Sequence, residues 1–296
     1  MIASRYFGKM SPIALGTWRM HEWGMSSAEL ASFLQGAVEA GVTTIDTADV
    51  YCNYGGERML GDALRRSPDL RDRIQLVTKC GVRLKSSDAP ASRVKHYDCS
   101  RAYVIQQVER SLQSLSTDRI DLLLLHRPDP LLDADELAEV FCALKQSGKV
   151  RSFGVSNFRP QQLELLQSRL PFPLVVNQIE LSLMRCSPMF DGTLDQCQKM
   201  RIVPMAWSPL AGGRLLSSDA RNDALEAVLS AIAGETGLTP EQVALCWLMR
   251  HPAGIVPVIG SGKLERVRLA IDAASYAMDR QHWFELLEAA TGCEVA

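Results

Sequence analysis

Short apolar segments alternate with longer amphipathic segments along the whole chain. The apolar segments are rich in Val, Ile and Leu and have the length of strands buried on both faces. They lie at residues 12–18, 42–46, 74–79, 120–126, 150–156, 174–179, 202–207 and 255–260. A segment with helical spacing follows each one, so the pattern predicts eight strands that alternate with helices.

Several of the predicted helices carry recognisable end signals. The clearest helical segments are residues 26–41, 133–148, 239–250 and 280–290. Ser26 and Glu29 form a capping box at the start of the first segment, and Asp133 and Thr239 are N-cap residues for the second and third. These signals support the alternation of strands and helices.

Eight buried strands separated by helices suit either a doubly wound sheet or a closed (β/α)8 barrel. The number of strands and the length of 296 residues favour the (β/α)8 TIM barrel. No GxGxxG motif follows the first strand, although a dinucleotide-binding doubly wound domain usually has one. No linker-like stretch divides the chain, so we expect a single barrel domain over residues 1–296.

Composition and charge narrow the choice of partner. The net charge is -2, from 32 basic and 34 acidic residues, and such a balance does not attract nucleic acid or anionic lipid. No apolar run reaches the roughly 18 to 20 residues that span a bilayer, and the N-terminus lacks the apolar core of a signal peptide. The 8 cysteines show no CxxC pair. We therefore expect a cytoplasmic protein that acts on a small molecule and binds neither nucleic acid nor membrane.

Polar residues close seven of the eight predicted strands. In a barrel of this type the active site lies at the carboxyl ends of the strands. The chance that the polar residues at all seven strand ends have no functional role is small. The residues at these positions are Asp46, Lys79, His126, Ser156, Asn157, Gln178, Trp207, Ser208 and those from Gly260 to Lys263. The sequence therefore predicts a catalytic site at this end of the barrel.

Asp46, Lys79 and His126 form a proton-transfer unit if Tyr51 joins them from the loop after residues 42–46. A phenol has a pKa near 10, and a nearby ammonium lowers it by stabilising the phenolate. We expect Lys79 to supply that charge, Asp46 to keep the lysine charged, and His126 to hydrogen-bond to a carbonyl oxygen. Asp49 is expected to be a solvated loop carboxylate.

Two loops are suited to binding phosphate. The segment IGSGKLERVR (259–268) places small residues and the cations Lys263, Arg266 and Arg268 at a predicted helix start. The segment SPLAGGR (208–214) is a second glycine-rich loop at the neighbouring strand. Together they suggest a ligand with more than one phosphate.

The chain resembles the aldo-keto reductases over residues 12–275, in the bacterial branch of cytosolic oxidoreductases. The resemblance rests on Asp46, Tyr51, Lys79 and His126 and on the motifs GVSNF (154–158), NQIE (177–180) and WSPLAGG (207–213). It implies an NADP(H)-dependent enzyme that reduces aldehydes or ketones to alcohols. Tyr51 would donate the proton, with Lys79 and Asp46 as the partners that set its pKa, and His126 would orient the carbonyl.

The resemblance also implies how the cofactor is held. The nicotinamide carboxamide would be bound by Ser156, Asn157 and Gln178, and the nicotinamide ring would stack on Trp207. The pyrophosphate would lie along Ser208 and Leu210. The 2′-phosphate would be surrounded by Gly260, Ser261, Lys263 and Arg266. Three departures stand out: Trp207 replaces a common tyrosine, Cys52 replaces the glycine that usually follows the catalytic tyrosine, and Leu269 and Ala270 replace a common Glu-Asn pair near the adenine.

Two other functions compete with this one. A metal-dependent hydrolase is disfavoured because the 5 histidines are dispersed and only His96 and Cys99 form a close pair, so no metal is expected. A redox-sensing or regulatory protein that binds NADP(H) with little turnover could use Cys52 and Cys80.

The substrate is not identified by the sequence, but its pocket is expected to be shaped by Trp18, His21 and Trp23 and by the long loop 81–99. We expect a monomer or weak oligomer.

Overall fold

The computed structural model describes residues 2–4, 8–85, 92–217, 223–294 and 296. Eight parallel strands in it close into a barrel, in which each strand pairs with its neighbours in chain order and the last returns to the first. The strands are β3 (Ala14–Gly16), β4 (Thr44–Asp46), β5 (Gln75–Cys80), β8 (Ile120–Leu125), β9 (Val150–Ser156), β10 (Val176–Glu180), β11 (Val203–Trp207) and β12 (Val256–Ile259). The predicted (β/α)8 barrel is therefore confirmed.

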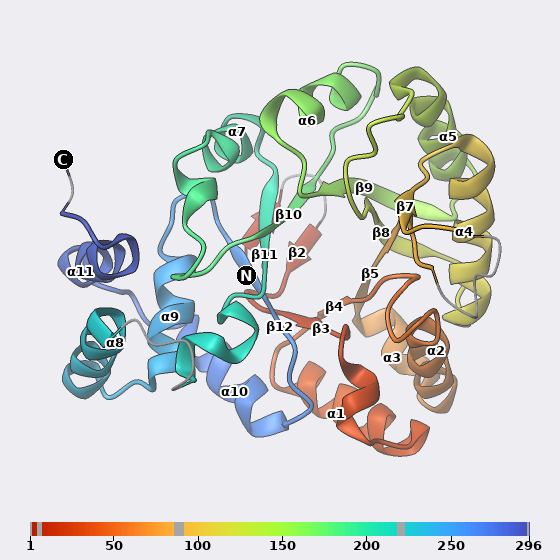
Figure 1. Ribbon diagram of the computed structural model, residues 1–296. Coiled ribbons are helices and arrows are strands. Elements are labelled where there is room, and N and C mark those ends of the chain that lie inside the picture. The colour runs from red at the N-terminus through yellow and green to blue at the C-terminus, as the bar shows by residue number, and fades with distance from the viewer. Residues whose placement is uncertain (1, 5–7, 86–91, 218–222, 295) are drawn as a thin grey trace.

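Helices surround the barrel, as Figure 1 shows. The α-helices are α1 (Ser27–Glu39), α2 (Gly56–Arg66), α3 (Pro68–Arg73), α4 (Arg101–Ser114), α5 (Ala134–Gln146), α6 (Pro160–Gln167), α7 (Thr193–Met200), α8 (Asp223–Thr236), α9 (Pro240–Met249), α10 (Leu264–Ala273) and α11 (Arg280–Thr291). Short 3-10 helices η1 (Met20–Trp23), η2 (Ser187–Met189) and η3 (Ala211–Leu216) follow β3, β10 and β11.

The predicted helix starts are confirmed at three N-caps. The Ser26 hydroxyl accepts a hydrogen bond from the Glu29 N–H, and the Glu29 carboxylate accepts one from the Ser26 N–H. Asp133 caps α5 through the N–H groups of its second and third residues, and Thr239 caps α9 through the Gln242 N–H. Each cap satisfies donors that the first helical turn leaves unpaired.

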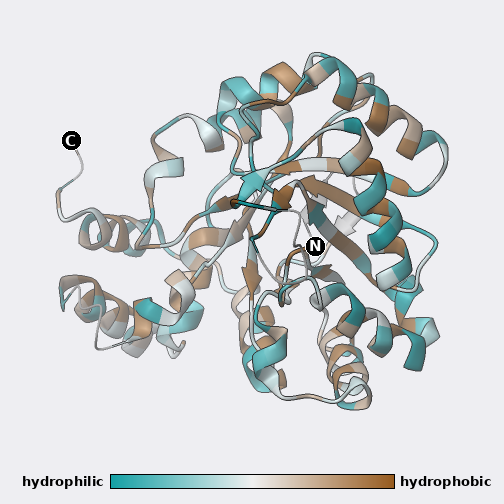
Figure 2. Cartoon of the chain, turned by 45° about the vertical axis from the view of Figure 1, so that its right-hand side comes forward, coloured by the Kyte–Doolittle hydropathy of each residue, from teal (hydrophilic) through white to brown (hydrophobic). Residues whose placement is uncertain are grey.

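The apolar residues form two layers. An inner cluster that includes Val77, Leu122, Leu124, Met205 and Val256 fills the barrel. Outer clusters join the other faces of the strands to the helices. Figure 2 shows the result, with largely apolar strands at the centre and helices in which hydrophilic and hydrophobic residues alternate. Because the strands are buried on both faces, their sequences are nearly continuous runs of apolar residues.

Two short antiparallel hairpins were not predicted. Strand β1 (Ile2–Ser4) pairs with β2 (Gly8–Met10) before the barrel, and β6 (Val82–Arg83) pairs with β7 (His96–Tyr97) within the loop 81–99. These strands are only two or three residues long, which is too short to show an alternating pattern. Part of the loop 81–99 lies outside the described residues.

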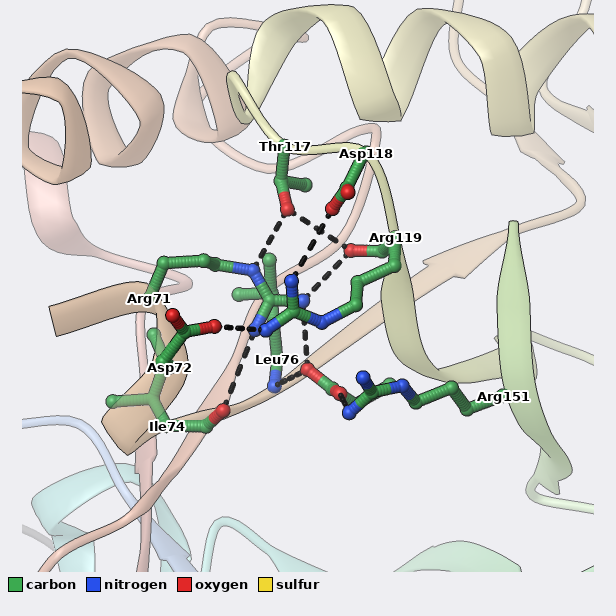
Figure 3. A network of polar contacts seen from close by, with 9 residues as sticks. Arg71, Asp72, Ile74, Leu76, Thr117, Asp118, Arg119 and Arg151 are labelled. Carbon is green, nitrogen blue, oxygen red and sulfur yellow. Dashed lines mark hydrogen bonds and ion pairs between the residues drawn. The ribbon is translucent and has the colours of Figure 1, made fainter. Parts of the chain in front are cut away.

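A network of charges around the buried Asp121 ties α3 to the amino ends of β5 and β8, as Figure 3 shows. The Asp121 carboxylate lies 2.8 Å from Arg71 Nη2 and 3.0 Å from Arg151 Nη1, and it accepts the Leu76 N–H at 3.0 Å. Arg71 also donates to the Thr117 hydroxyl at 2.8 Å. The network lies at the end of the barrel opposite to the polar strand ends, so its role is structural. Among the described residues no helix is both long and apolar enough to cross a membrane.

Candidate active site

Lys79 connects the predicted proton-transfer residues at the carboxyl end of the barrel. Its ammonium donates to Asp46 Oδ2 at 2.8 Å, to the Thr47 carbonyl at 2.8 Å and to the Tyr51 hydroxyl at 3.1 Å. These contacts use all three of its N–H donors. Lys79 is fully buried, and Asp46 is 2% exposed. Neighbouring strands β4 and β5 bring the two residues together, as the strand-end argument predicts.

The pKa values of Lys79 and Tyr51 follow from burial and from their mutual contact. Burial alone lowers the pKa of Lys79, but Asp46 and Tyr51 outweigh it and raise the pKa above its ordinary value. Burial raises the pKa of Tyr51, and the opposing effect of Lys79 does not cancel it. The expectation of a net lowered phenol pKa is therefore wrong for this state of the protein. The tyrosine is held protonated, as a proton donor must be.

His126 lies beside Tyr51 and is neutral. The two rings meet edge to face, with centroids 5.8 Å apart and an angle of 77° between their planes. Burial, followed by the charges of Lys79, Arg127 and Lys95, holds the pKa of His126 well below its usual value. Its Nδ1 atom is buried and has no hydrogen-bond partner among the described residues. A neutral imidazole in this position can donate one hydrogen bond to a carbonyl oxygen.

The loop after Tyr51 adopts an unusual backbone. Cys52, Asn53 and Tyr54 have φ angles of 52°, 53° and 67°, a left-handed region that favours glycine. The Gly56 N–H donates to the Tyr51 carbonyl at 3.0 Å and closes the turn. The position of Cys52 therefore suits the glycine that the resemblance places there, and the cysteine accepts a strain of about 1 to 2 kcal/mol.

A second set of predicted residues forms a chain of hydrogen bonds that leads away from Asp46. Gln178 Nε2 donates to Asp46 Oδ1 at 2.7 Å. The Ser156 hydroxyl donates to the Gln178 carbonyl at 2.9 Å and accepts from Asn157 Nδ2 at 2.7 Å. Trp207 Nε1 then donates to Asn157 Oδ1 at 3.0 Å. The structure thus joins the residues expected at the nicotinamide directly to the catalytic candidates.

The predicted phosphate loop precedes α10, and Lys263 is the N-cap residue of that helix. The Ser261 hydroxyl accepts the Lys263 N–H at 3.2 Å. Lys263 and Arg266 are exposed, and neither makes an ion pair within the described ranges. A dianionic phosphate fits this arrangement, because cations, small residues and unpaired N–H groups meet at a helix start. In the neighbouring loop Ser208 has φ 50°, and Leu210 is half-buried just before η3.

The three residues expected in the substrate pocket lie on and before η1. Trp18 is 57% exposed, and its carbonyl lies 3.6 Å from the Cys52 thiol, next to Tyr51. His21 is exposed. Trp23 packs against Phe33 and lies directly over Gly262 of the phosphate loop, where a Cβ would come within 2.6 Å of its ring. Trp23 therefore supports the phosphate loop, whereas Trp18 borders the segment that carries Tyr51.

The expectation for Asp49 is wrong, because this carboxylate is 6% exposed. Its Oδ1 atom accepts the Val50 N–H at 2.7 Å, while Oδ2 is buried without a hydrogen bond in the described part of the chain. Burial, followed by the nearby Glu57 carboxylate, raises the pKa of Asp49 well above its usual value. Asp49 is thus a buried acid, and its burial favours the protonated form.

Glu57 is a buried acid that the sequence analysis missed. It lies in the first turn of α2 and accepts the Thr78 hydroxyl at 2.6 Å. Burial raises its pKa to about 7, although the hydrogen bonds from Thr78 and Ser111 oppose the shift. An acid in a first helical turn normally serves the helix dipole, so the sequence held no signal of its burial.

The described residues do not support the competing hypotheses of a metal-dependent hydrolase and a redox sensor. Among these residues there is no group of three His, Cys, Asp or Glu side chains that could bind a metal ion. Burial raises the pKa of the Cys52 thiol and, to a much greater extent, that of Cys80. Both therefore remain protonated, and a redox sensor usually needs a thiolate.

The Tyr51–Lys79–Asp46 unit lies beside a neutral histidine at the carboxyl end of a (β/α)8 barrel, an arrangement suited to proton transfer. The aldo/keto reductase family matches residues 12–290, and the chain belongs to this family. It is 48% identical over 289 residues to the uncharacterized oxidoreductase YcsN of Bacillus subtilis, covering 97% of this chain and 96% of YcsN.

Two further comparisons bear on the site. The chain is 46% identical over 289 residues to the 6-dehydroglucose reductase of Agrobacterium fabrum, covering 97% of each protein. The crystal structure of an aldo-keto reductase from Klebsiella pneumoniae in complex with NADPH superimposes with a TM-score of 0.79 at 27% identity, covering 97% of this chain and 94% of that one.

Proposed function

We propose that this protein reduces aldehydes or ketones to alcohols with NADPH and that Tyr51 delivers the proton. The chain of hydrogen bonds from Tyr51 through the buried Lys79 to Asp46 is the observation that carries the proposal. When bound, NADPH supplies the hydride that attacks the carbonyl carbon. Tyr51 gives its proton to the carbonyl oxygen, and the Lys79 ammonium stabilises the phenolate that remains.

The other site residues position these two groups. Asp46 keeps Lys79 charged and fixed, and His126 donates a hydrogen bond that orients the carbonyl oxygen. Ser156, Asn157 and Gln178 bind the nicotinamide carboxamide, and the ring of Trp207 lies against the nicotinamide. Ser208 and Leu210 follow the pyrophosphate, while the phosphate loop, with Gly260, Ser261, Lys263 and Arg266, holds the 2′-phosphate.

A hydroxylated aldehyde is the favoured substrate. The relative from Agrobacterium fabrum is named 6-dehydroglucose reductase, and the alignment spans 97% of both proteins. We therefore place a sugar aldehyde first among the compounds to test. All eight cysteines are free, which suits a reducing compartment, and we expect a cytoplasmic enzyme that is a monomer or weak oligomer.

A regulatory protein that binds NADP(H) with little turnover is the second candidate. It would have no use for a proton donor, and the protonated Cys52 and Cys80 thiols do not favour redox sensing. Reductase activity is therefore the better supported function.

Replacing Tyr51 with phenylalanine tests the proposal. The variant keeps the ring but removes the dissociable proton, so kcat for a good aldehyde should fall about 10²- to 10⁴-fold while Kd for NADPH stays near the wild-type value. Stopped assays of NADPH oxidation and calorimetric titration measure the two quantities.

Tyr54→Phe is the matched control. Tyr54 lies three residues further along the chain, and its hydroxyl accepts the Leu84 N–H at 2.9 Å, away from Lys79. Its removal should change kcat by no more than about threefold. Equal kcat values for wild type and Tyr51→Phe would rule out the proposed mechanism.

A further inference from the structure

Arg127 is a cation that follows His126 and has no charge partner among the described residues. It follows His126 at the end of β8 and is half-buried. Its guanidinium lies 5.4 Å from the centroid of the Trp207 ring. Within the described residues it forms no ion pair and donates no hydrogen bond. Its five N–H donors are therefore available to a ligand.

The position of Arg127 is fixed from both sides. The loop that follows is anchored by Asp129, whose carboxylate accepts the N–H groups of Cys99 at 3.0 Å and of Leu131 at 2.9 Å. The Trp207 ring is held by its hydrogen bond to Asn157. A guanidinium that rests on a ring through its face keeps the N–H donors at its edge free.

The charge of Arg127 reaches the reacting residues. Burial and Lys79 dominate the low pKa of His126, and Arg127 is the next contributor. Burial raises the pKa of Tyr51, and Arg127 is among the charges that oppose the rise. The guanidinium thus lies within electrostatic reach of the position where the carbonyl oxygen would be protonated.

We propose that Arg127 is a specificity residue that binds oxygen atoms of the substrate beyond its carbonyl, so that aldehydes with hydroxyl or carboxylate substituents are preferred to alkyl aldehydes. The proposal rests on the proposed reductase activity. A guanidinium edge offers two parallel N–H groups, which suit the paired oxygens of a vicinal diol or of a carboxylate. An alkyl chain in the same place would leave these donors buried without partners.

Two matched pairs of substrates test the inference. D-Glyceraldehyde and propanal have three carbons and differ in hydroxyl groups, and succinic semialdehyde and butanal have four carbons and differ in a carboxylate. In each pair the measured quantity is the ratio of kcat/KM for the substituted over the plain aldehyde. We expect a wild-type ratio above one in at least one pair, and a fall in that ratio of about 10- to 100-fold in Arg127→Met. The pair that responds identifies the substituent.

Arg58→Met is the control for the loss of a surface charge. Arg58 is exposed on α2, outside the residues assigned to the site, and no contact joins it to Trp207 within the described residues. The kcat/KM ratios of this control variant should remain within about twofold of the wild-type ratios. Unchanged ratios in Arg127→Met, or equal falls in both variants, would overturn the inference.

A binding measurement keeps the inference separate from the proposed function. If the wild type oxidises NADPH with none of the four aldehydes, the proposed activity fails for them. Calorimetric titration of the NADPH-bound protein with succinate and with glycerol then decides the role of Arg127. Weaker binding of either compound to Arg127→Met than to wild type supports the inference, and equal binding of both contradicts it.

Discussion

Glu57 shows how one buried carboxylate makes stability depend on pH. Its pKa is raised from an ordinary value of 4.5 to about 7 in the folded protein, chiefly by burial. Between these values the unfolded chain loses the proton while the folded chain keeps it. The folded state therefore binds more protons, and the free energy of unfolding falls as pH rises through this window. The stabilisation is complete below pH 4.5 and is lost above about pH 7.

Replacing Glu57 with glutamine should remove this dependence. The amide oxygen can still accept the Thr78 hydroxyl, but the side chain no longer titrates. The slope of unfolding free energy against pH should flatten between about pH 4.5 and 7, and the variant should be more stable than wild type at pH 8 by up to about 3 kcal/mol. Urea denaturation at several pH values measures both quantities.

Glu226→Gln is the control, because Glu226 is exposed on α8. This variant should retain the wild-type slope of unfolding free energy against pH. Burial also raises the pKa of Asp49, so its titration contributes to the pH dependence in wild type and in both variants. Parallel curves for wild type and Glu57→Gln would contradict the assignment.

Individual site residues were predictable where a strand fixes their direction. Asp46 and Lys79 end neighbouring parallel strands, so their contact follows from the strand count alone. Asp49 is only three residues beyond Asp46, but its N–H bonds to the Lys79 carbonyl, and its carboxylate is enclosed near Glu57. The path of a loop has no periodicity that a sequence could reveal.

At the scale of elements, apolar runs predicted all eight barrel strands and capping residues predicted three helix starts. The boundaries were less accurate: residues 12–18 were expected in the first strand, whereas β3 covers only Ala14–Gly16. The remaining residues of that segment form bends, a turn and irregular structure, although they continue its apolar composition. The network around Asp121 was not predicted, because its partners come from separate elements.

That network should contribute strongly to stability. Arg71→Met would leave the nearly buried Asp121 carboxylate without its main counter-ion, and such changes cost about 3 to 5 kcal/mol. The Arg151 contact and the Leu76 N–H remain, so we expect the lower end of this range. Urea denaturation measures the loss, and kcat of the folded protein should not change, because the network lies at the opposite end of the barrel from Tyr51.

Arg119→Met is the comparison within the same network. Arg119 pairs with Asp72 and Asp118, whose side chains are 78% and 84% exposed, and exposed pairs contribute less than about 1 kcal/mol. Similar losses for Arg71→Met and Arg119→Met would show that burial of the Asp121 pair does not determine its contribution.

At the scale of the whole molecule, closure of the barrel brings the carboxyl ends of the strands into one site. The expected ligand contacts are distributed over several of these strand ends. The predicted proton-transfer residues lie at or just after the ends of β4, β5 and β8, whereas the predicted phosphate loop follows β12. Binding at the phosphate loop should therefore stabilise the fold without affecting the chemical step. A ligand that binds only the folded state raises stability by an amount set by its concentration relative to Kd.

NADPH should raise the melting temperature much more than NADH does. Two charge-assisted hydrogen bonds to the 2′-phosphate favour NADPH by roughly two to four powers of ten. At 100 times its Kd, NADPH stabilises by about 2.7 kcal/mol, whereas NADH at the same concentration adds less than about 0.5 kcal/mol. For a protein of this size the difference corresponds to several degrees, on the order of 5 °C. Thermal unfolding with each cofactor measures it.

The joint replacement of Lys263 and Arg266 by alanine should bring the two shifts together, because the 2′-phosphate would lose its cationic partners. Arg268→Ala removes an exposed charge from the same helix but beyond its first turn, where the field of the helix end has decayed. It should therefore keep most of the difference between NADPH and NADH. Equal shifts with both cofactors in the wild type would contradict the assignment of the loop. An equal effect of Arg268→Ala and the double substitution would mean that overall charge, rather than direct contact with the phosphate, selects the cofactor.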